Sequence, residues 1–249
     1  MQLHHKTALV TGASKGIGKA IARALGEAGA SVVVSSRDQA AVDAVAAEFS
    51  AAGIRAAAAA CNVGRLDELP GLISRTLEHF GRLDILVNNA GINPVFGPAL
   101  EIDWRAYDKI MDVNVKGPFE LARLAHPHLK AQGGGSVINI SSVEGFTPSP
   151  GLGIYSVSKA SLIMLTKVLA REWGPDGIRV NAICPGFVRT KLSQALFENK
   201  AVHQMIMGKQ ALRHEGSPED IAGLALLLAS DAGQFITGAA LTADGGLTI

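Results

Sequence analysis

Cysteine is nearly absent from this chain of 249 residues, which has only Cys61 and Cys184. Two thiols that lie far apart in the sequence provide no disulfide framework, and they are typical of proteins kept in a reducing compartment. We therefore expect a cytoplasmic protein in which both cysteines are buried, apolar side chains.

An excess of either charge is also lacking. The chain has 23 Lys and Arg against 22 Asp and Glu, and only 18% of its residues are charged. This balance gives no electrostatic reason to expect nucleic acid or an anionic membrane as a partner. No apolar run reaches the roughly 18 residues of a membrane span. Residues 1–6 lead directly into a strand-like segment, so we expect no signal peptide. We also expect no membrane partner and no metal ion.

Aromatic residues are few, at 5%, whereas glycine is frequent, with 28 residues, and 48% of the chain is hydrophobic. This is enough for one sizeable core and does not require two. Short β-branched runs alternate with segments rich in Ala and Leu. The alternation predicts an α/β fold, a doubly wound Rossmann-type parallel sheet in three layers, with a single domain over residues 1–249.

The expected elements follow from hydrophobic pattern and from capping residues. Asp38 is expected to cap a helix, and a long helix is expected to bend near Gly117-Pro118. The stretch of about 187–217 has weak regular signals and is expected to be a substrate loop. Strands are expected at 7–11, 31–36, 56–61, 84–87, 136–140, 179–183 and 240–242, and helices up to about 28, after 38, and at 66–80, 103–132, 155–173 and 218–230.

A glycine-rich segment, Thr11-Gly12-Ala13-Ser14-Lys15-Gly16-Ile17-Gly18, follows the first expected strand and opens the first helix. Glycine lets backbone N–H groups approach a pyrophosphate, and a helix N-terminus favours negative charge. The spacing G-x-x-x-G-x-G differs from G-x-G-x-x-G. A turn needed only for close packing is the alternative, but the place of the segment in a βαβ unit favours dinucleotide binding.

The end of the second strand indicates which dinucleotide binds. An NAD site places an acidic residue there, whereas this strand ends Val34-Ser35-Ser36-Arg37. Arg37 can bind a 2′-phosphate in a bidentate manner, and Lys15 supplies a second positive charge. We therefore expect NADP(H). Two solvated surface charges are the alternative, and Asp38 would favour NAD if it pointed into the site instead of capping a helix.

Tyr155 and Lys159 are four residues apart, so on a helix they share one face. A lysine ammonium favours the phenolate over the phenol, so the pair predicts a lowered tyrosine pKa and a general acid or base. Ser142, thirteen residues before Tyr155, is expected to hold a substrate oxygen at the same point. Alone the Tyr-x-x-x-Lys pair is weak evidence, because such spacings arise by chance.

Taken together, the sequence resembles the short-chain dehydrogenase/reductase family over nearly its whole length. The resemblance is carried, in the family's order and spacing, by Thr11–Gly18, Asn88-Asn89-Ala90-Gly91, Asn114, Ser142, Tyr155-x-x-x-Lys159 and Pro185-Gly186. It implies that Tyr155 gives a proton to a carbonyl as hydride is transferred. It further implies that Lys159 lowers the pKa of Tyr155 and holds the ribose, that Ser142 binds the carbonyl oxygen, and that Asn114 holds a water of a proton relay. For Asn114, a purely structural buried amide is an alternative that does not exclude the relay.

The same resemblance and the glycine-rich turn assign the cofactor contacts. Asn62 stands where many members have Asp, and its side-chain oxygen can still accept from the adenine amino group. The residues expected at NADP(H) are Gly12, Ser14, Lys15, Gly16, Ile17, Gly18, Ser36, Arg37, Asn62, Val63, Asn89, Ala90, Gly91, Tyr155, Lys159, Pro185, Gly186, Val188 and Thr190.

Within the family, three segments look like those of NADPH-dependent carbonyl and retinal reductases: 33–37, 91–97 and 146–151. The C-terminal Ser-x-Leu address of the peroxisomal members is replaced by Leu247-Thr248-Ile249. A largely apolar substrate wall favours aryl, alkyl or polyene carbonyls, although several of these side chains can instead pack the core. The expected wall consists of Phe96, Val143, Phe146, Leu152 and Phe187, with the loop over 191–212. Glu144 is given no role.

Three other functions remain open. A 3-oxoacyl-[acyl-carrier-protein] reductase is disfavoured by Leu152, where that subgroup often has Gln, and by Asn93-Pro94. An NAD-linked alcohol or sugar dehydrogenase is disfavoured by the lack of an acid at Ser36. A non-catalytic dinucleotide-binding module is disfavoured because Ser142, Tyr155 and Lys159 are all present. The resemblance also implies a homotetramer that pairs the helices at 103–132 and 155–173.

Overall fold

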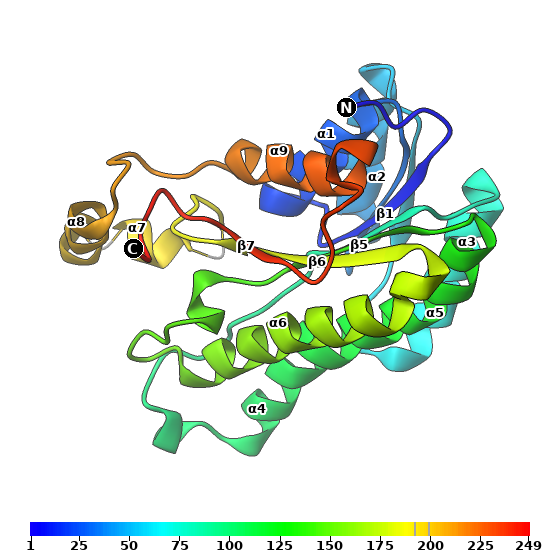
Figure 1. Cartoon of the computed structure of the whole chain (residues 1–249). Helices are drawn as coiled ribbons and strands as arrows, with labels where there is room; N and C mark the ends of the chain where they lie inside the picture. Colours follow the sequence, from blue (N-terminus) through cyan, green and yellow to red (C-terminus); the bar gives the residue numbers. More distant parts are fainter. Residues whose placement is uncertain (192, 199) are drawn as a thin grey trace.

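The computed structural model of the chain describes residues 1–191, 193–198 and 200–249. Its centre is a seven-stranded, entirely parallel sheet in the order β3-β2-β1-β4-β5-β6-β7 (Figure 1). The strands are β1 Thr7–Thr11, β2 Ser31–Ser36, β3 Ala56–Ala60, β4 Ile85–Asn88, β5 Gly135–Ile140, β6 Ile178–Pro185 and β7 Ala240–Ala243. The order reverses between β1 and β4, and doubly wound sheets bind ligands at the carboxyl ends of the strands beside such a reversal.

Helices cover both faces of the sheet and give three layers, as the sequence predicts (Figure 1). One face carries α1 Gly16–Glu27, α2 Gln39–Ala51 and α9 Pro218–Ala229; the other carries α3 Leu69–Phe80, α4 Trp104–Met111, α5 Gly117–Ala131 and α6 Gly153–Trp173. The two apolar cores lie on opposite sides of the central strands, whose side chains alternate between them: Val10 belongs to one core and Leu9 to the other. Central strands buried on both faces explain the nearly continuous apolar runs of the sequence.

Local sequence signals place most helix ends. Asp38 caps α2, because its carboxylate accepts from the Ala41 N–H at 3.2 Å, as predicted. Ser217 and Asp220 form a capping box at the start of α9, where Pro218 occupies the first turn. Gly81 ends α3 in the left-handed conformation.

The predicted helix at 103–132 differs from the observed one. It is divided into α4 and α5 by a π-helical segment, Asp112–Lys116, so the irregularity begins before the predicted bend at Gly117-Pro118. Such a segment inserts an extra residue into the helix and is frequently found at functional sites. Its middle residue, Asn114, is fully buried.

The predicted substrate loop contains helical structure that the sequence did not indicate. Two short helices, α7 Gln194–Glu198 and α8 Lys200–Lys209, lie in it, and Leu192 and Asn199 are outside the described residues. Both helices lie beyond the carboxyl ends of the strands, beside the C-terminus (Figure 1). We call residues 187–217 the lid.

The helix that carries Tyr155 is unusually long and apolar. By length and composition alone, the segment Gly153–Asp176 resembles a membrane-crossing helix. Ser156, Lys159, Leu162 and Thr166, however, are buried inside the protein. This is the expected behaviour of a core helix of a globular domain, whose apolar stripe faces the sheet.

Candidate functional site

A large cavity of about 2290 Å³ extends along the carboxyl ends of the strands, between the sheet and the lid. Every residue predicted to contact the cofactor lines it, together with Ser142. Two predicted site residues, Asn114 and Phe146, do not line it. Sites that extend along a sheet in this way suit an elongated ligand with a reactive end.

The glycine-rich turn lies at the end of the cavity where α1 begins. A Cβ on Gly18 would lie 2.3 Å from Asn89 Nδ2 and 2.5 Å from the Gly12 carbonyl oxygen, so only glycine fits. Gly12 itself adopts a φ of +64°, in the left-handed region that glycine favours. The turn therefore brings bare backbone to the N-terminus of α1, where backbone N–H groups and the helix dipole favour a phosphate.

Asn89 and Thr11 hold this turn against the end of β4. The Asn89 amide donates to the carbonyl oxygens of Thr11 at 2.8 Å and Gly12 at 3.2 Å. The Thr11 hydroxyl in turn accepts from the backbone N–H groups of Asn89 and Ala90, both at 3.1 Å. The ends of β1 and β4 are thus joined. These hydrogen bonds, all within the protein, fix the backbone at the bottom of the cavity. A second buried amide pair, Asn88 Nδ2 to Asn139 Oδ1 at 2.9 Å, braces β4 against β5.

Two exposed cations face the cavity, Lys15 from the glycine-rich turn and Arg37 from the end of β2. Lys15 and Arg37 both line it, and neither has an ion-pair partner among the residues that the structure describes. The carboxylate of Asp38, next to Arg37 in the sequence, is engaged in capping α2. Ser36 adds a hydroxyl 3.4 Å from the Asp38 backbone N–H. Two cations and a hydroxyl thus line this end of the cavity, and the neighbouring carboxylate serves as a helix cap.

Polar groups around Asn62 form part of the cavity floor. Asn62 Oδ1 accepts from the Gly64 backbone N–H at 3.2 Å, and the Asn62 N–H donates to Glu68 at 2.8 Å. Val63 next to it is buried. The second lone pair of Asn62 Oδ1 remains the position for the predicted adenine contact.

Ser142 and Tyr155 meet at the reactive end. Ser142 precedes a short turn, Val143–Gly145, and its hydroxyl accepts from the Glu144 backbone N–H at 3.1 Å. Burial raises the pKa of the Tyr155 phenol to about 12, a hydrogen bond with Ser142 opposes that rise, and the charge of Glu144 adds to it. The predicted lowering of this pKa is therefore wrong for the protein alone, because the loss of hydration outweighs the stabilisation of the phenolate.

Lys159 lies one helical turn from Tyr155 and is only 4% exposed. Its ammonium donates to the Ile140 carbonyl oxygen at 2.9 Å and lies 5.6 Å from the centre of the Tyr155 ring. Burial lowers the pKa of Lys159 to about 8. The lysine is thus held at the end of β5 in a state that exchanges its proton near neutral pH.

Asn114, in the π-helical segment, braces the chain after β4 against α6. Its amide oxygen accepts from the Ile92 N–H at 2.9 Å, while its NH₂ donates to the Ile92 carbonyl and the Ser158 hydroxyl, at 2.9 and 3.0 Å. A Cβ on Gly91 would lie 3.3 Å from Lys159 Nζ and 3.5 Å from Asn114 Oδ1, so both groups flank this glycine. The structure shows the bracing role of Asn114 directly. The predicted water relay would use the remaining lone pair of Oδ1.

The segment after β6 completes the cofactor side. Pro185, Gly186 and Val188 line the cavity, and a Cβ on Gly186 would lie 2.5 Å from Asp244 Cβ. The Thr190 N–H donates to Ser193 Oγ at 3.0 Å, and the two hydroxyls are 3.1 Å apart. Thr190 also lies beside Gly16, so the lid begins in contact with the glycine-rich turn.

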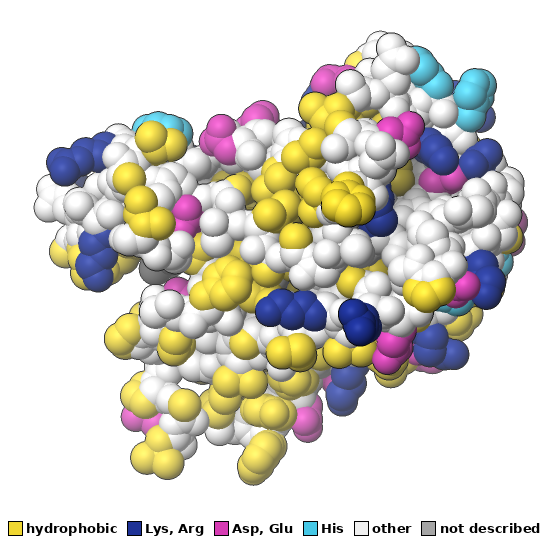
Figure 2. Space-filling view, viewed as in Figure 1, with side chains coloured by type: hydrophobic (Ala, Val, Ile, Leu, Met, Phe, Trp, Pro, Cys, Tyr) yellow, Lys and Arg dark blue, Asp and Glu magenta, His cyan; other side chains and the backbone are white. Residues whose placement is uncertain are grey.

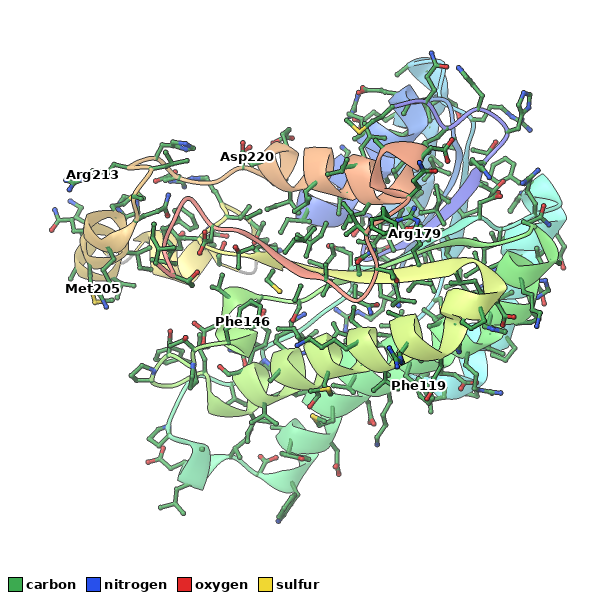
Figure 3. The ribbon with its side chains drawn as sticks, viewed as in Figure 1. Phe119, Phe146, Arg179, Met205, Arg213 and Asp220 are labelled. Carbon is green, nitrogen blue, oxygen red and sulfur yellow. The ribbon has the colours of Figure 1, made fainter. Side chains whose placement is uncertain are left out.

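The substrate side is largely apolar, as predicted, but its membership differs. Phe96, Val143, Leu152 and Phe187 line the cavity, whereas Phe146 (Figure 3), whose side chain is 48% exposed, does not. Four lid residues within the predicted loop over 191–212 also line it: Val202, Met205, Ile206 and Lys209. Leu247 and Thr248, from the C-terminus, complete the wall and were not predicted. No local pattern marks them, since they reach the cavity only through the tertiary fold.

The lid is held together by side chains. Glu215 accepts from Arg189 through two bonds of 2.7 Å and pairs with His203 at 2.8 Å. Phe187 and Phe197 stack with their ring centres 3.9 Å apart. These contacts join the beginning, middle and end of the lid over the substrate side.

The C-terminal residues are fixed by one carboxylate. Asp244 accepts from the Gly246 N–H at 2.9 Å, the Thr248 N–H at 3.0 Å and the Thr248 hydroxyl at 2.7 Å. The Leu212 N–H donates to the Gly245 carbonyl at 2.8 Å and joins this segment to the lid. Leu247 is thereby directed into the cavity wall.

Among the described residues, no group of three or more His, Cys, Asp or Glu lies together as a metal site would require.

Known proteins similar to this chain match it along nearly its whole length. A family model described as Enoyl-(Acyl carrier protein) reductase matches residues 12–248. Dehydrogenase/reductase SDR family member 4 of Oryctolagus cuniculus is 41% identical over 244 residues, covering 98% of this chain and 94% of the relative. The protein of the same name from Caenorhabditis elegans is 41% identical over 246 residues, covering 97% of this chain and 95% of the relative.

Solved structures agree with the fold. The crystal structure of a gluconate 5-dehydrogenase from Burkholderia cenocepacia J2315, in complex with NADP and tartrate, superposes with a TM-score of 0.96 at 34% identity and covers 99% of this chain and 96% of that one. A short-chain type dehydrogenase/reductase from Mycobacterium marinum gives a TM-score of 0.93 at 38% identity, covering 99% of this chain and 97% of the other.

Proposed function

The chain belongs to the short-chain dehydrogenase/reductase family, and from this premise we propose that it is an NADPH-dependent reductase of ketone or aldehyde carbonyls. One observation carries the proposal: Ser142, Tyr155 and Lys159 converge on the cavity that also holds the glycine-rich turn. A proton donor at the reactive end of a dinucleotide site is the arrangement that carbonyl reduction requires.

Each residue has a separate task in the proposed reaction. When bound, NADPH supplies the hydride. Ser142 donates a hydrogen bond to the carbonyl oxygen and stabilises the charge that develops there. Tyr155 gives its phenolic proton to the same oxygen, and its raised pKa keeps it protonated near neutral pH. Lys159 favours the resulting phenolate by its charge and exchanges a proton with a pKa of about 8, which suits renewal of the Tyr155 proton.

The preference for NADPH over NADH rests on the end of β2. Lys15 and Arg37 are free to bind a 2′-phosphate, and the Asp38 carboxylate is occupied. The complex of NADP with the Burkholderia cenocepacia relative supports the same cofactor. The apolar wall supports a hydrophobic carbonyl compound as substrate, such as an aryl ketone, a dicarbonyl or retinal.

One observation favours a second candidate, the reduction of a 3-oxoacyl thioester. Lys191 and Lys209 line the cavity at the lid, and neither has an ionic partner among the described residues. Cations at the rim of an apolar chamber suit an acyl chain attached to an anionic carrier.

The deciding experiment follows the oxidation of NADPH and NADH by absorbance against aryl ketones, dicarbonyls, retinal and acetoacetyl thioesters. We expect NADPH to be preferred and Tyr155→Phe to reduce kcat by about 100- to 10,000-fold, since it removes only the acid–base group. Tyr107→Phe, at an aromatic pair with Trp104 away from the cavity, is the matched control and should retain activity. Full activity of Tyr155→Phe would refute the assignment, and selective turnover of the thioester would favour the second candidate.

We also propose that the protein is a cytoplasmic homotetramer. Hydrophobic side chains lie at the surface over α4 and α6, in the lower part of Figure 2. Val157, Met164 and Val168 follow one outer face of α6 and are 48%, 59% and 43% exposed, and Phe119 of α5 is 43% exposed (Figure 3). An apolar face of this kind is typical of an interface between subunits. Light scattering after size-exclusion chromatography measures the mass directly, and a monomer would contradict the proposal.

A further inference from the structure

Glu144 lies two residues after Ser142 and lines the same cavity. Its carboxylate connects the turn after β5 with the first turns of α6. We propose that Glu144 is a positioning residue that sets the relation between Ser142 and Tyr155. The inference rests on the proposed role of Tyr155 as the proton donor.

The connection consists of three hydrogen bonds to two serines. Glu144 accepts from the Ser149 backbone N–H at 2.8 Å, from the Ser149 hydroxyl at 2.6 Å and from the Ser156 hydroxyl at 2.9 Å. Ser156 is the next residue after Tyr155 in α6. The backbone N–H of Glu144 donates to the Ser142 hydroxyl at 3.1 Å. One residue therefore touches Ser142 through its main chain and the neighbour of Tyr155 through its side chain.

The turn is pressed directly onto α6, which makes this connection short. A Cβ on Gly145 would lie 3.0 Å from the Lys159 carbonyl oxygen and 2.7 Å from Ile163 Cδ1. The Ser141 hydroxyl donates to the same Lys159 carbonyl at 2.9 Å. Residues before and after Ser142 thus contact α6 at Lys159 and Ile163. Glu144 adds a contact nearer the start of α6, at Ser156.

A carboxylate is required for a second reason. The charged or titratable groups around Tyr155 are Glu144 from the turn and Lys159 from α6, with Cys184 of β6 beside Lys159. No cation is paired with Glu144 among the described residues, so its charge opposes ionisation of the phenol. Burial is the main cause of the raised pKa of Tyr155, and the negative charge of Glu144 adds to it, while the bonds of Glu144 fix the distance to Ser142.

The test uses Glu144→Ala, which removes bonds and charge, and Glu144→Gln, which removes the charge and keeps one oxygen acceptor. Glu120→Gln is the matched control, because it deletes the same charge from α5 at a carboxylate paired with Arg123, outside the cavity. We expect kcat to fall by about 10- to 100-fold in Glu144→Ala, since small errors in position are costly to proton transfer. NADPH affinity, measured by fluorescence, should remain unchanged.

The pH profile separates positioning from a merely structural contribution. Carbonyl reduction requires protonated Tyr155, so its rate falls as pH rises through the pKa of that phenol. Removal of the Glu144 charge lowers this pKa, so the alkaline limb of the kcat profile should move to lower pH in Glu144→Gln and stay in place in Glu120→Gln. If Glu144→Ala does not fold, Ser156→Ala tests the link to α6 alone, and we expect kcat to fall several-fold at unchanged NADPH affinity.

The outcomes distinguish this inference from the proposed function. A Glu144→Gln enzyme with the wild-type alkaline limb, or a folded Glu144→Ala enzyme with wild-type kcat, would overturn the positioning role while Tyr155→Phe stays inactive. If Tyr155→Phe itself keeps its activity, the proposed function fails and this inference fails with it.

Discussion

The two halves of the cavity are lined by different parts of the chain, one mainly by backbone and the other mainly by side chains. The cofactor half consists of backbone at the ends of β1 and β4, fixed by Thr11 and Asn89, where glycine leaves no room for a side chain. The substrate half consists of side chains from the lid and the C-terminus, held by Glu215 and Asp244. The first half specifies one ligand through main-chain geometry. The second half can change its side chains without disturbing the sheet, which is how one fold serves many substrates.

The two halves also differ in how far apart their residues lie in the sequence. The glycine-rich turn is local, because its residues continue directly from the end of β1 into α1. The substrate wall joins Phe96, the lid helices and Leu247, which are far apart in sequence. We therefore expect changes in the cofactor half to abolish binding and changes in the substrate half to alter selectivity.

The most severe test of the comparison is Gly18→Ala. Its new Cβ would lie 2.3 Å from Asn89 Nδ2 and 2.5 Å from the Gly12 carbonyl oxygen. The Gly12 contact is backbone, and the Asn89 amide is held by its bonds to Thr11 and Gly12, so neither neighbour can move away easily. We expect NADPH affinity, measured by fluorescence titration, to fall by more than about 100-fold. Gly223→Ala in α9, where a Cβ meets open space, is the control and should leave affinity unchanged while stabilising the fold by up to about 1 kcal/mol. Tight NADPH binding by Gly18→Ala would show that the floor is more adaptable than its contacts indicate.

Arg37→Ala sharpens the comparison at the edge of the cofactor half. A charge-assisted bond to a phosphate contributes about 1.5–3 kcal/mol, so we expect the Kd for NADPH to rise about 10- to 100-fold and that for NADH to stay constant. Arg171→Ala, at an exposed arginine of α6 outside the cavity, should change neither constant. Equal losses for both cofactors would mean that Arg37 does not select the 2′-phosphate.

The smallest effect is expected in the substrate half, from Leu247→Ala. Loss of part of an apolar wall weakens contact with a bulky substrate by about 1–2 kcal/mol, so KM for large carbonyls should rise by about 5- to 30-fold. KM for small carbonyls and NADPH affinity should not change. Ile249→Ala, two residues further and 99% exposed, is the control. A loss of NADPH affinity in Leu247→Ala would contradict the separation of the two halves.

The same division decides how much the sequence could predict. The sheet, the cap at Asp38 and the site around Tyr155 depend on local patterns and on ordered spacings, and the structure contains them. The pKa of Tyr155 could not be predicted from its spacing to Lys159, because burial, which only the fold determines, has the larger effect.

Other features were missed because they arise between distant segments. The π-helical segment at Asn114 is stabilised by Ile92 and Ser158, neither of which is local to it. Phe146 was expected in the substrate wall, but it is half exposed and does not line the cavity. Leu247 is indistinguishable by sequence from any apolar residue near a chain end. The bonds of Glu144 depend on Ser149 and Ser156, whose hydroxyls gave no signal of their own.

The cap at Asp38 has a consequence for redesign of the cofactor preference. The carboxylate that caps α2 also lines the cavity next to Arg37, so helix initiation and local charge are set by one side chain. Turning it toward a ribose would leave the Ala41 N–H without its partner and cost about 1 kcal/mol of stability. An engineer seeking an NADH enzyme would therefore introduce a new acid at Ser36 and leave Asp38 in place.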